Sequence, residues 1–292
     1  RMKNTLSNKL NNLLEDSLVN DSLMGEVLSK LSDHNEIYLL HDPSPIRKPH
    51  STKTENLGKV TDLNGKIING YSTHNIVVVN PKSKKVHLLF HETYSNKDKK
   101  FLKAEFVNKI EKGKSFKSQE EAYSLYEAND WFNKKTITKS AIKSVSSKIK
   151  EEYAGMKIVH VLDREFDDDD YFSFIASQKD EFIIRVKKSR ASENKNEKLI
   201  NKKFSNSKVV PIQKIFLKKK CYQDVNLEIS WNKYLNYTAV IIKFTDKNNQ
   251  NIFKHPMLLV TNKSVKNFEE AQLIYHIYLK RSRIECVFKT LK

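Results

Sequence analysis

The chain has 292 residues, of which 38% are hydrophobic, and this is enough to bury one large core or two smaller ones. Its 53 Lys and Arg residues outnumber 35 Asp and Glu residues, which gives a net charge of +18. No apolar run approaches the roughly 18 residues of a membrane span, no signal peptide opens the chain, and the two cysteines lack the spacing of a thiolate zinc site. We therefore expect an intracellular protein with no membrane partner. Its charge favours a polyanion such as nucleic acid, although an AT-rich genome also enriches lysine.

The N-terminal part of the chain predicts helices and then a group of strands. Residues 1–35 contain short leucine-spaced segments between polar turns, which indicate two or three small helices. Because the chain begins with Arg1, we expect this segment to be a truncated region. The run EIYLLHD predicts a strand that ends at Asp42, because prolines follow it. Strand patterns at 66–80 and 84–95, joined by a turn-like Asn-Pro pair, predict a meander.

The middle of the chain alternates helix and strand patterns. Residues 118–150 contain no Gly or Pro and have helix-spaced apolar residues, so they predict one or two helices. The nearly unbroken apolar run KIVHVLD predicts a strand buried on both faces that ends at Asp163. The sequence then predicts a short helix over 169–179 and a strand over 180–189.

The C-terminal part begins with a change in amino-acid composition. Between about residues 191 and 255, Lys- and Asn-rich turns separate alternating strand patterns, which predicts a β-rich insertion. The run PMLLVT predicts one more strand, and Asn267 is expected to begin a helix that reaches the end of the chain.

The last 18 residues, 275–292, contain no Gly or Pro and are typical of a helix. At 100° per residue, five side chains fall within a sector of about 80° beside an apolar stripe. These five are Tyr278, Arg281, Glu285, Lys289 and Lys292. One carboxylate therefore lies in a row of cations, although an ordinary amphipathic surface helix with a solvated basic side has the same pattern.

Three carboxylates stand out by position. Asp42 and Asp163 each end an apolar strand, and Glu285 lies on the helix that follows. Carboxylate oxygens are the ligands that Mg²⁺ prefers, and a two-metal site for phosphoryl transfer needs such a set. Each aspartate also has a structural alternative, because Asp42 before Pro43 suits a turn and Asp163 suits a helix N-cap.

Two motifs make the pattern more specific. The stretch VLDREFD, residues 161–167, followed by FIIRVK, resembles the second-aspartate motif of bacterial DDE transposases of insertion-sequence family four. The spacing Tyr278-x2-Arg281-x3-Glu285-x6-Lys292 is similar to the Y-R-E-K signature of that family at every position. The region around Asp42, LLHDPSPIRK, is similar to the first-aspartate region.

The resemblance implies an α/β fold with an RNase H-like mixed sheet flanked by helices and a β-rich insertion before the last catalytic helix. It covers residues 36 to 292. The implied organisation has four parts: an N-terminal helical segment at 1–35, the first part of the catalytic core at 36–190, the insertion at 191–255, and the last strand and Glu-bearing helix at 256–292.

The resemblance also implies roles for individual residues. Asp42, Asp163 and Glu285 would be catalytic and would bind two Mg²⁺ or Mn²⁺ ions. The expected DNA-binding residues are Tyr278, Arg281, Lys292, Arg164 and Lys289. Glu165 would lie near the catalytic pocket, and Met257 stands where some relatives have a Trp that stacks on a flipped base.

Other polar residues near these motifs have simpler explanations. Asp168, Asp169 and Asp170 are expected to be the solvated acidic start of a helix. His41 and His160 flank the strand-ending aspartates, and strand alternation directs them to the opposite side, where a structural role is expected.

The implied function is that of a DNA transposase that cleaves strands at transposon ends and transfers them to target DNA. Its partners would be double-stranded DNA and a second copy of the chain, as a homodimer in the synaptic complex, in the bacterial cytoplasm at the nucleoid. Relatives continue beyond Lys292, so a truncated chain is expected. An inactive DNA-binding remnant or transposition inhibitor is the alternative, and a general RNase H-like nuclease is a third reading.

Overall fold

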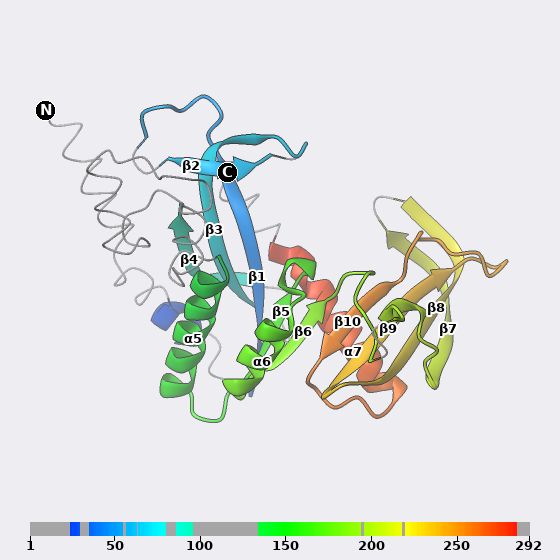
Figure 1. Ribbon diagram of the computed structural model, residues 1–292. Coiled ribbons are helices and arrows are strands. Elements are labelled where there is room, and N and C mark those ends of the chain that lie inside the picture. The colour runs from blue at the N-terminus through cyan, green and yellow to red at the C-terminus, as the bar shows by residue number, and fades with distance from the viewer. Residues whose placement is uncertain are drawn as a thin grey trace, which may run out of the picture. The chain divides into compact units, whose positions relative to one another are not determined.

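The computed structural model describes residues 24–29, 35–54, 57–62, 64–79, 86–95, 134–193, 196–217 and 220–284 (Figure 1). The chain forms two compact units. The first unit comprises Arg1–Asp33, Asp42–Val77 and His87–Ala154, and the second comprises His34–His41, Val78–Val86 and Gly155–Lys292.

The first unit contains the end of β1 (Glu36–Arg47), β2 (Gly58–Thr61), most of β3 (Ile67–Val79) and β4 (Val86–Tyr94), and α5 (Lys134–Glu152). Strand β3 pairs with β4, which confirms the predicted meander, and β2 pairs with β3 in antiparallel register. Gly70 in β3 is required by close packing, because a Cβ there would lie 2.3 Å from the Ile46 carbonyl oxygen. Helix α5 confirms the predicted helix from residue 134 onward, whereas residues 118–133 lie outside the described part.

Strand β1 does not end at Asp42, as the prolines led us to expect, but continues to Arg47. Its pairing with β5 ends at Leu40. Pro43 and Pro45 alternate with Asp42 and Ser44, whose carbonyl oxygens accept hydrogen bonds from the side chains of Asn75 and Thr73. The missing proline N–H groups therefore face the side where the ladder with β5 has already ended, so no ladder bond is lost.

The second unit is built on a mixed sheet. The start of β1, β5 (Lys157–Leu162) and β6 (Glu181–Arg185) are neighbouring parallel strands. Antiparallel strands continue the sheet from β6, in the order β10 (Met257–Thr261), β9 (Tyr237–Thr245), β8 (Lys220–Tyr234) and β7 (Asn206–Leu217). The predicted β-rich insertion is thus present as strands, and it extends the same sheet through β10 (Figure 1).

Two helices cover this sheet. Phe172 of α6 (Asp169–Ser177) stacks on Phe182 of β6, with ring centroids 5.2 Å apart. Helix α7 (Phe268–Leu279) begins at Asn267, whose side chain accepts a hydrogen bond from the Glu270 amide, as the sequence predicted. Its Tyr275 packs edge-on against Phe244 of β9. Short 3-10 turns complete the unit: η3 (Arg164–Phe166), η4 (Leu199–Asn201) and η5 (Lys280–Arg283).

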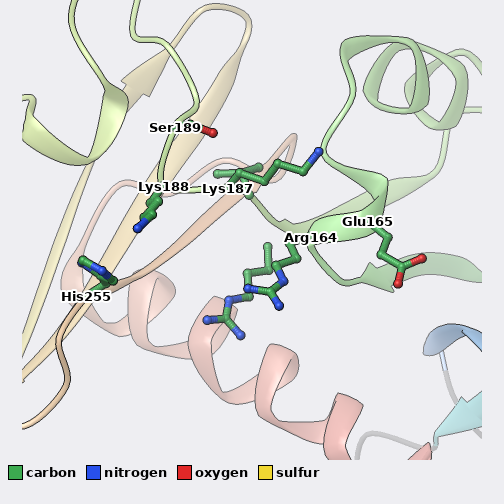
Figure 2. Close-up of a pocket in the computed structure, with 8 residues that line it drawn as sticks. Arg164, Glu165, Lys187, Lys188, Ser189 and His255 are labelled. Atoms are coloured by element: carbon green, nitrogen blue, oxygen red, sulfur yellow. The ribbon is translucent and has the colours of Figure 1, made fainter. Parts of the chain in front are cut away.

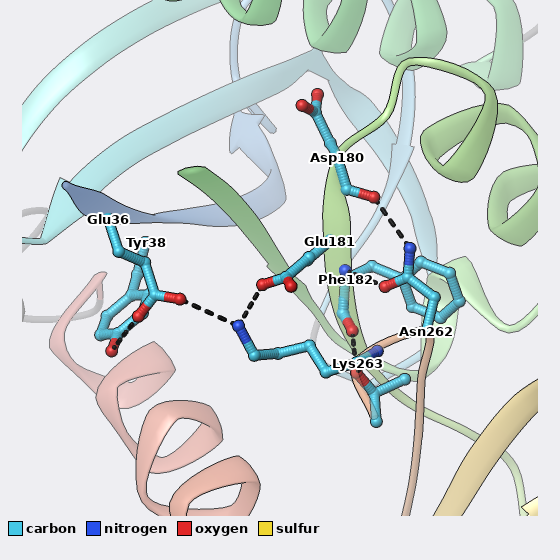
Figure 3. Close-up of polar contacts among 8 residues, drawn as sticks. Glu36, Tyr38, Asp180, Glu181, Phe182, Asn262 and Lys263 are labelled. Carbon is cyan, nitrogen blue, oxygen red and sulfur yellow. Dashed lines mark hydrogen bonds and ion pairs between the residues drawn. The ribbon is translucent and has the colours of Figure 1, made fainter. Parts of the chain in front are cut away.

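The loop between β10 and α7 is anchored by two consecutive side chains. Asn262 donates to the Asp180 carbonyl oxygen at 2.8 Å and accepts from the Phe182 amide at 2.8 Å. The Lys263 ammonium lies between the carboxylates of Glu36 and Glu181, at 2.9 Å from Glu36 (Figure 3). These contacts tie the start of α7 to the first residues of β1 and β6.

The C-terminal helix differs from its prediction at one point. A continuous helix was expected over 275–292, but α7 ends at Leu279 and η5 follows it. A 3-10 turn is tighter than an α-turn, so it changes the angular order of the side chains after Leu279. The mixed α/β class with a large mixed sheet flanked by helices is confirmed. Within the described residues, none of the helices has the length and apolarity needed to cross a membrane.

Candidate active site

Asp163 follows the last residue of β5 and makes two different contacts. Its Oδ1 accepts a hydrogen bond from the Glu165 amide at 2.9 Å, so it is the N-cap of η3. Its Oδ2 accepts a hydrogen bond from Arg281 Nη2 at 3.0 Å. The structural role considered for Asp163 is therefore real, and the same carboxylate also forms an ion pair with a residue 118 positions away.

Arg281 contacts Asp163, and Tyr278 lies three residues before Arg281 in the chain and within the electrostatic influence of Asp163. Tyr278 is on α7 and is buried, and Arg281 is in η5, three residues further on. Burial raises the pKa of Tyr278, and the positive charges of Arg281 and Arg185 partly offset this effect. The phenol therefore stays protonated at neutral pH and remains able to donate a hydrogen bond. Two positions of the expected signature thus lie beside Asp163.

A basic pocket of about 730 Å³ lies in the same unit (Figure 2). Its walls come from η3, from the end of β6 and the turn after it, and from the loop before β10. It is lined by Arg164, Glu165, Arg185, Val186, Lys187, Lys188, Ser189 and His255. Figure 2 shows Lys188 and His255 at one end of this group and Glu165 at the other. The four cations outnumber the single carboxylate, so the pocket suits an anionic ligand.

Sequence reasoning found Arg164 and Glu165 but missed most of this pocket. The basic residues Lys187 and Lys188 come one residue after the apolar strand β6, and a basic pair near the end of a buried strand can be recognised in the sequence. His255 carries no such signal. It reaches the pocket only because the β9–β10 connection folds back toward the end of β6.

Asp42 lies in the first unit, within β1. Its carboxylate accepts a hydrogen bond from the Ser44 hydroxyl, and its carbonyl oxygen accepts one from Asn75 Nδ2 at 3.1 Å. Asn75 is itself held by His91, whose Nδ1 is 2.6 Å from Asn75 Oδ1. The side chain of Asp42 is thus held by its own strand, and its main chain is fixed by a side chain of β3.

The histidines beside the two aspartates form a buried pair in the second unit. His41 Nε2 and His160 Nδ1 share a hydrogen bond of 2.9 Å, and His160 Nε2 lies 3.2 Å from an oxygen of Asp180. All three residues are buried. Their contacts connect β1, β5 and the start of β6, which agrees with the structural role expected for the histidines.

The remaining predicted site residues have different outcomes. Glu285, Lys289 and Lys292 lie outside the described residues. Met257 is the first residue of β10, two positions after His255 of the pocket. Asp168 is the N-cap of α6 and accepts a hydrogen bond from the Asp170 amide, which agrees with the expected acidic helix start.

The described residues contain no cluster of three His, Cys, Asp or Glu side chains arranged to hold a metal ion. Asp163 is nevertheless chemically suited to be one ligand of a divalent ion. A carboxylate offers about four lone-pair positions, and Asp163 contacts one protein donor with each oxygen.

No protein-family model matches the chain, and no curated protein has a matching sequence.

Proposed function

We propose that the chain is a DNA transposase with an RNase H-like catalytic core. The observation that carries this proposal is the ion pair between Asp163, directly after a parallel strand, and Arg281 of η5. Residues in both motifs that resemble those of insertion-sequence family four therefore meet in space. The adjacent parallel strands β1, β5 and β6, with further strands inserted before β10 and α7, support the RNase H-like arrangement.

The ligand in this proposal is double-stranded DNA. Arg164, Arg185, Lys187 and Lys188 would bind phosphate oxygens of the backbone. Tyr278 would add a neutral hydrogen-bond donor, because a tyrosine phenol is protonated at neutral pH even without the rise in its pKa. The side chains that line the pocket include four cations and no Phe, Tyr or Trp, which favours phosphate binding over base stacking.

Asp42, Asp163 and Glu285 would hold two Mg²⁺ or Mn²⁺ ions. This assignment rests on the resemblance of the motifs around the three carboxylates, and the place of Asp163 directly after the parallel strand β5 supports its part in it. When bound, the ions would supply positive charge to the attacking and leaving oxygens of an in-line displacement. The protein side chains would orient the phosphodiester and hold the carboxylates in place.

The proposed reaction has two steps. Water cleaves a phosphodiester bond at the transposon end and leaves a free 3′-hydroxyl group. That hydroxyl then attacks a second phosphodiester bond and displaces another 3′-oxygen, so the second step exchanges one ester for another. Arg281 and the cations of the pocket would bind the phosphate in both steps, and two copies of the chain would hold the paired ends.

Replacing one carboxylate by its amide tests the proposal. Asp163→Asn keeps an N-cap side chain but removes the negative charge. With a supercoiled plasmid carrying the coding sequence and its flanking DNA, the variant should nick at least about a hundredfold more slowly than the wild type in Mg²⁺. Its affinity for DNA should be equal or higher.

Asp168→Asn is the matched control, because Asp168 caps α6 in the way that Asp163 caps η3. Nicking by the control should be unchanged. A normal nicking rate for Asp163→Asn would remove Asp163 from the site. A wild-type chain that binds the plasmid but does not nick it in Mg²⁺ or Mn²⁺ would favour the inactive DNA-binding alternative.

A further inference from the structure

Arg190, the residue before the insertion, contacts four side chains. Its Nη1 donates to Asp167 Oδ1 at 2.6 Å, its Nη2 forms an ion pair with Asp169, and its Nε donates to the Tyr234 hydroxyl at 3.1 Å. The guanidinium carbon also lies 4.7 Å from the ring centroid of Phe172. The side chain is only 10% exposed, so these contacts hold the guanidinium in one place.

Asp167 connects Arg190 to both walls of the basic pocket. One of its oxygens binds Arg190, and the other accepts a hydrogen bond from the Lys187 amide at 2.7 Å. Asp167 immediately follows η3, which contributes Arg164 to one wall, and Lys187 begins the other wall. The turn from Lys187 to Arg190 is closed by a hydrogen bond between the Arg190 amide and the Lys187 carbonyl oxygen.

Tyr234 connects the same residue to the insertion. It lies at the end of β8, and its hydroxyl accepts from Arg190 and donates to the Ala191 carbonyl oxygen at 3.1 Å. Burial acts to lower the pKa of Arg190, but the contacts with Tyr234 and Asp167 outweigh it and raise the pKa above its ordinary value. An arginine is charged at neutral pH in any case, so the guanidinium places a full positive charge between Asp167, Asp169 and Tyr234.

We propose that Arg190 is a positioning residue that sets the spacing between the two walls of the basic pocket. It does not line the pocket itself, and it acts through Asp167 and the turn of Lys187. The inference rests on the proposed function in one respect, which is that the pocket binds DNA phosphates. A lysine cannot replace Arg190, because one ammonium on a flexible chain cannot reach two carboxylates and a phenol in fixed directions.

The test compares charge-preserving variants. Arg190→Lys is the main variant, and Tyr234→Phe removes one hydroxyl group without altering any charge. Lys202→Arg is the control, because Lys202 forms a separate ion pair with Glu193 in the same segment of the chain. For each folded protein, one measures hydrogen exchange of the Lys187 amide and the affinity for a short fluorescein-labelled DNA duplex.

Arg190→Lys should speed exchange of the Lys187 amide and weaken duplex binding, each by about tenfold, because misplaced walls fit phosphates less well. Tyr234→Phe should have the same effects at smaller size, and Lys202→Arg should match the wild type within about twofold. A general loss of stability would speed exchange of protected amides throughout the fold and leave the duplex affinity of the folded protein unchanged, whereas a loss of positioning speeds exchange of the Lys187 amide selectively and weakens binding.

The two proposals fail in different ways. Unchanged exchange and affinity in folded Arg190→Lys would overturn the positioning role. If Arg190→Lys does not fold, Tyr234→Phe decides in the same way. A wild-type chain that does not bind the duplex would overturn the proposed function, and exchange of the Lys187 amide would still decide whether Arg190 fixes the pocket wall.

Discussion

Asp163 shows how one carboxylate serves local structure and a distant contact together. It caps η3 through one oxygen and binds Arg281 through the other. The ion pair is mostly shielded from water, with side chains that are 23% and 16% exposed, so water compensates only partly for its loss. Removing either side chain should therefore leave the other charge without its counterion and lower the free energy of unfolding.

A double-mutant cycle at this pair measures that coupling. We expect Arg281→Gln to lower the free energy of unfolding by about 1–2 kcal/mol, because it leaves the Asp163 carboxylate without its cation. In the Asp163→Asn background the same change should cost much less. Urea denaturation of the four proteins gives the coupling energy, and additive effects would show that the two side chains do not interact in solution.

At this scale the sequence predicted positions better than contacts. The spacing of Tyr278 and Arg281 and the strand-ending place of Asp163 are sequence properties, and all three residues lie together in the structure. The contacts of Arg185 and His255 were not predictable, because they depend on how the end of β6 and the β9–β10 loop fold toward each other.

The β10–α7 connection anchors the start of α7 through two consecutive side chains. Lys263 binds Glu36 and Glu181, which begin two parallel strands, and Asn262 binds the main chain of β6 on both sides of Glu181 (Figure 3). Burial tends to lower the pKa of Lys263, but the hydrogen bonds and charges of the two carboxylates raise it above its ordinary value.

Lys263→Met should lower the free energy of unfolding at neutral pH by about 1–3 kcal/mol, since two carboxylates lose their common cation. A raised lysine pKa contributes stability below the pKa of the unfolded chain, and that contribution is lost as the pH rises through the folded pKa. The wild type and the variant should therefore become more similar in stability above about pH 10.4.

Lys266→Met is the control for this prediction, because Lys266 is an exposed lysine in the same loop. Denaturant midpoints of all three proteins between neutral and alkaline pH give the comparison. An equal loss in Lys263→Met and Lys266→Met at neutral pH would contradict a specific role for Lys263.

Most elements were predictable from apolar periodicity, and the errors have physical causes. Strand β1 continues through two prolines because their missing N–H groups lie where pairing with β5 has ended. The point at which pairing with a neighbouring strand ends depends on that neighbour, so it cannot be recognised from the sequence of β1 alone. Strand β2 was not predicted as a strand, because four residues are too few to show an alternating pattern.

For the molecule as a whole, composition and the order of the elements predicted the mixed α/β class. The pairing of the strands, in contrast, could be learned only from the structure. The insertion was expected to interrupt the core in sequence, and the structure adds that its strands continue the sheet of the second unit through β10. Pairing between strands distant in sequence is decided by tertiary packing and leaves little trace in local patterns. The net charge of +18 is consistent with the proposed DNA substrate but does not identify it.

The proposed metal site can be tested directly with a crystal of the protein soaked in Mn²⁺, with anomalous scattering used to locate the metal. We expect an anomalous peak with Asp42, Asp163 and Glu285 as ligands. Metal–oxygen distances of about 2.0–2.2 Å are expected. Well-ordered carboxylates more than about 8 Å apart, with no anomalous peak between them, would contradict the proposed metal site, because side chains at that separation cannot share one ion.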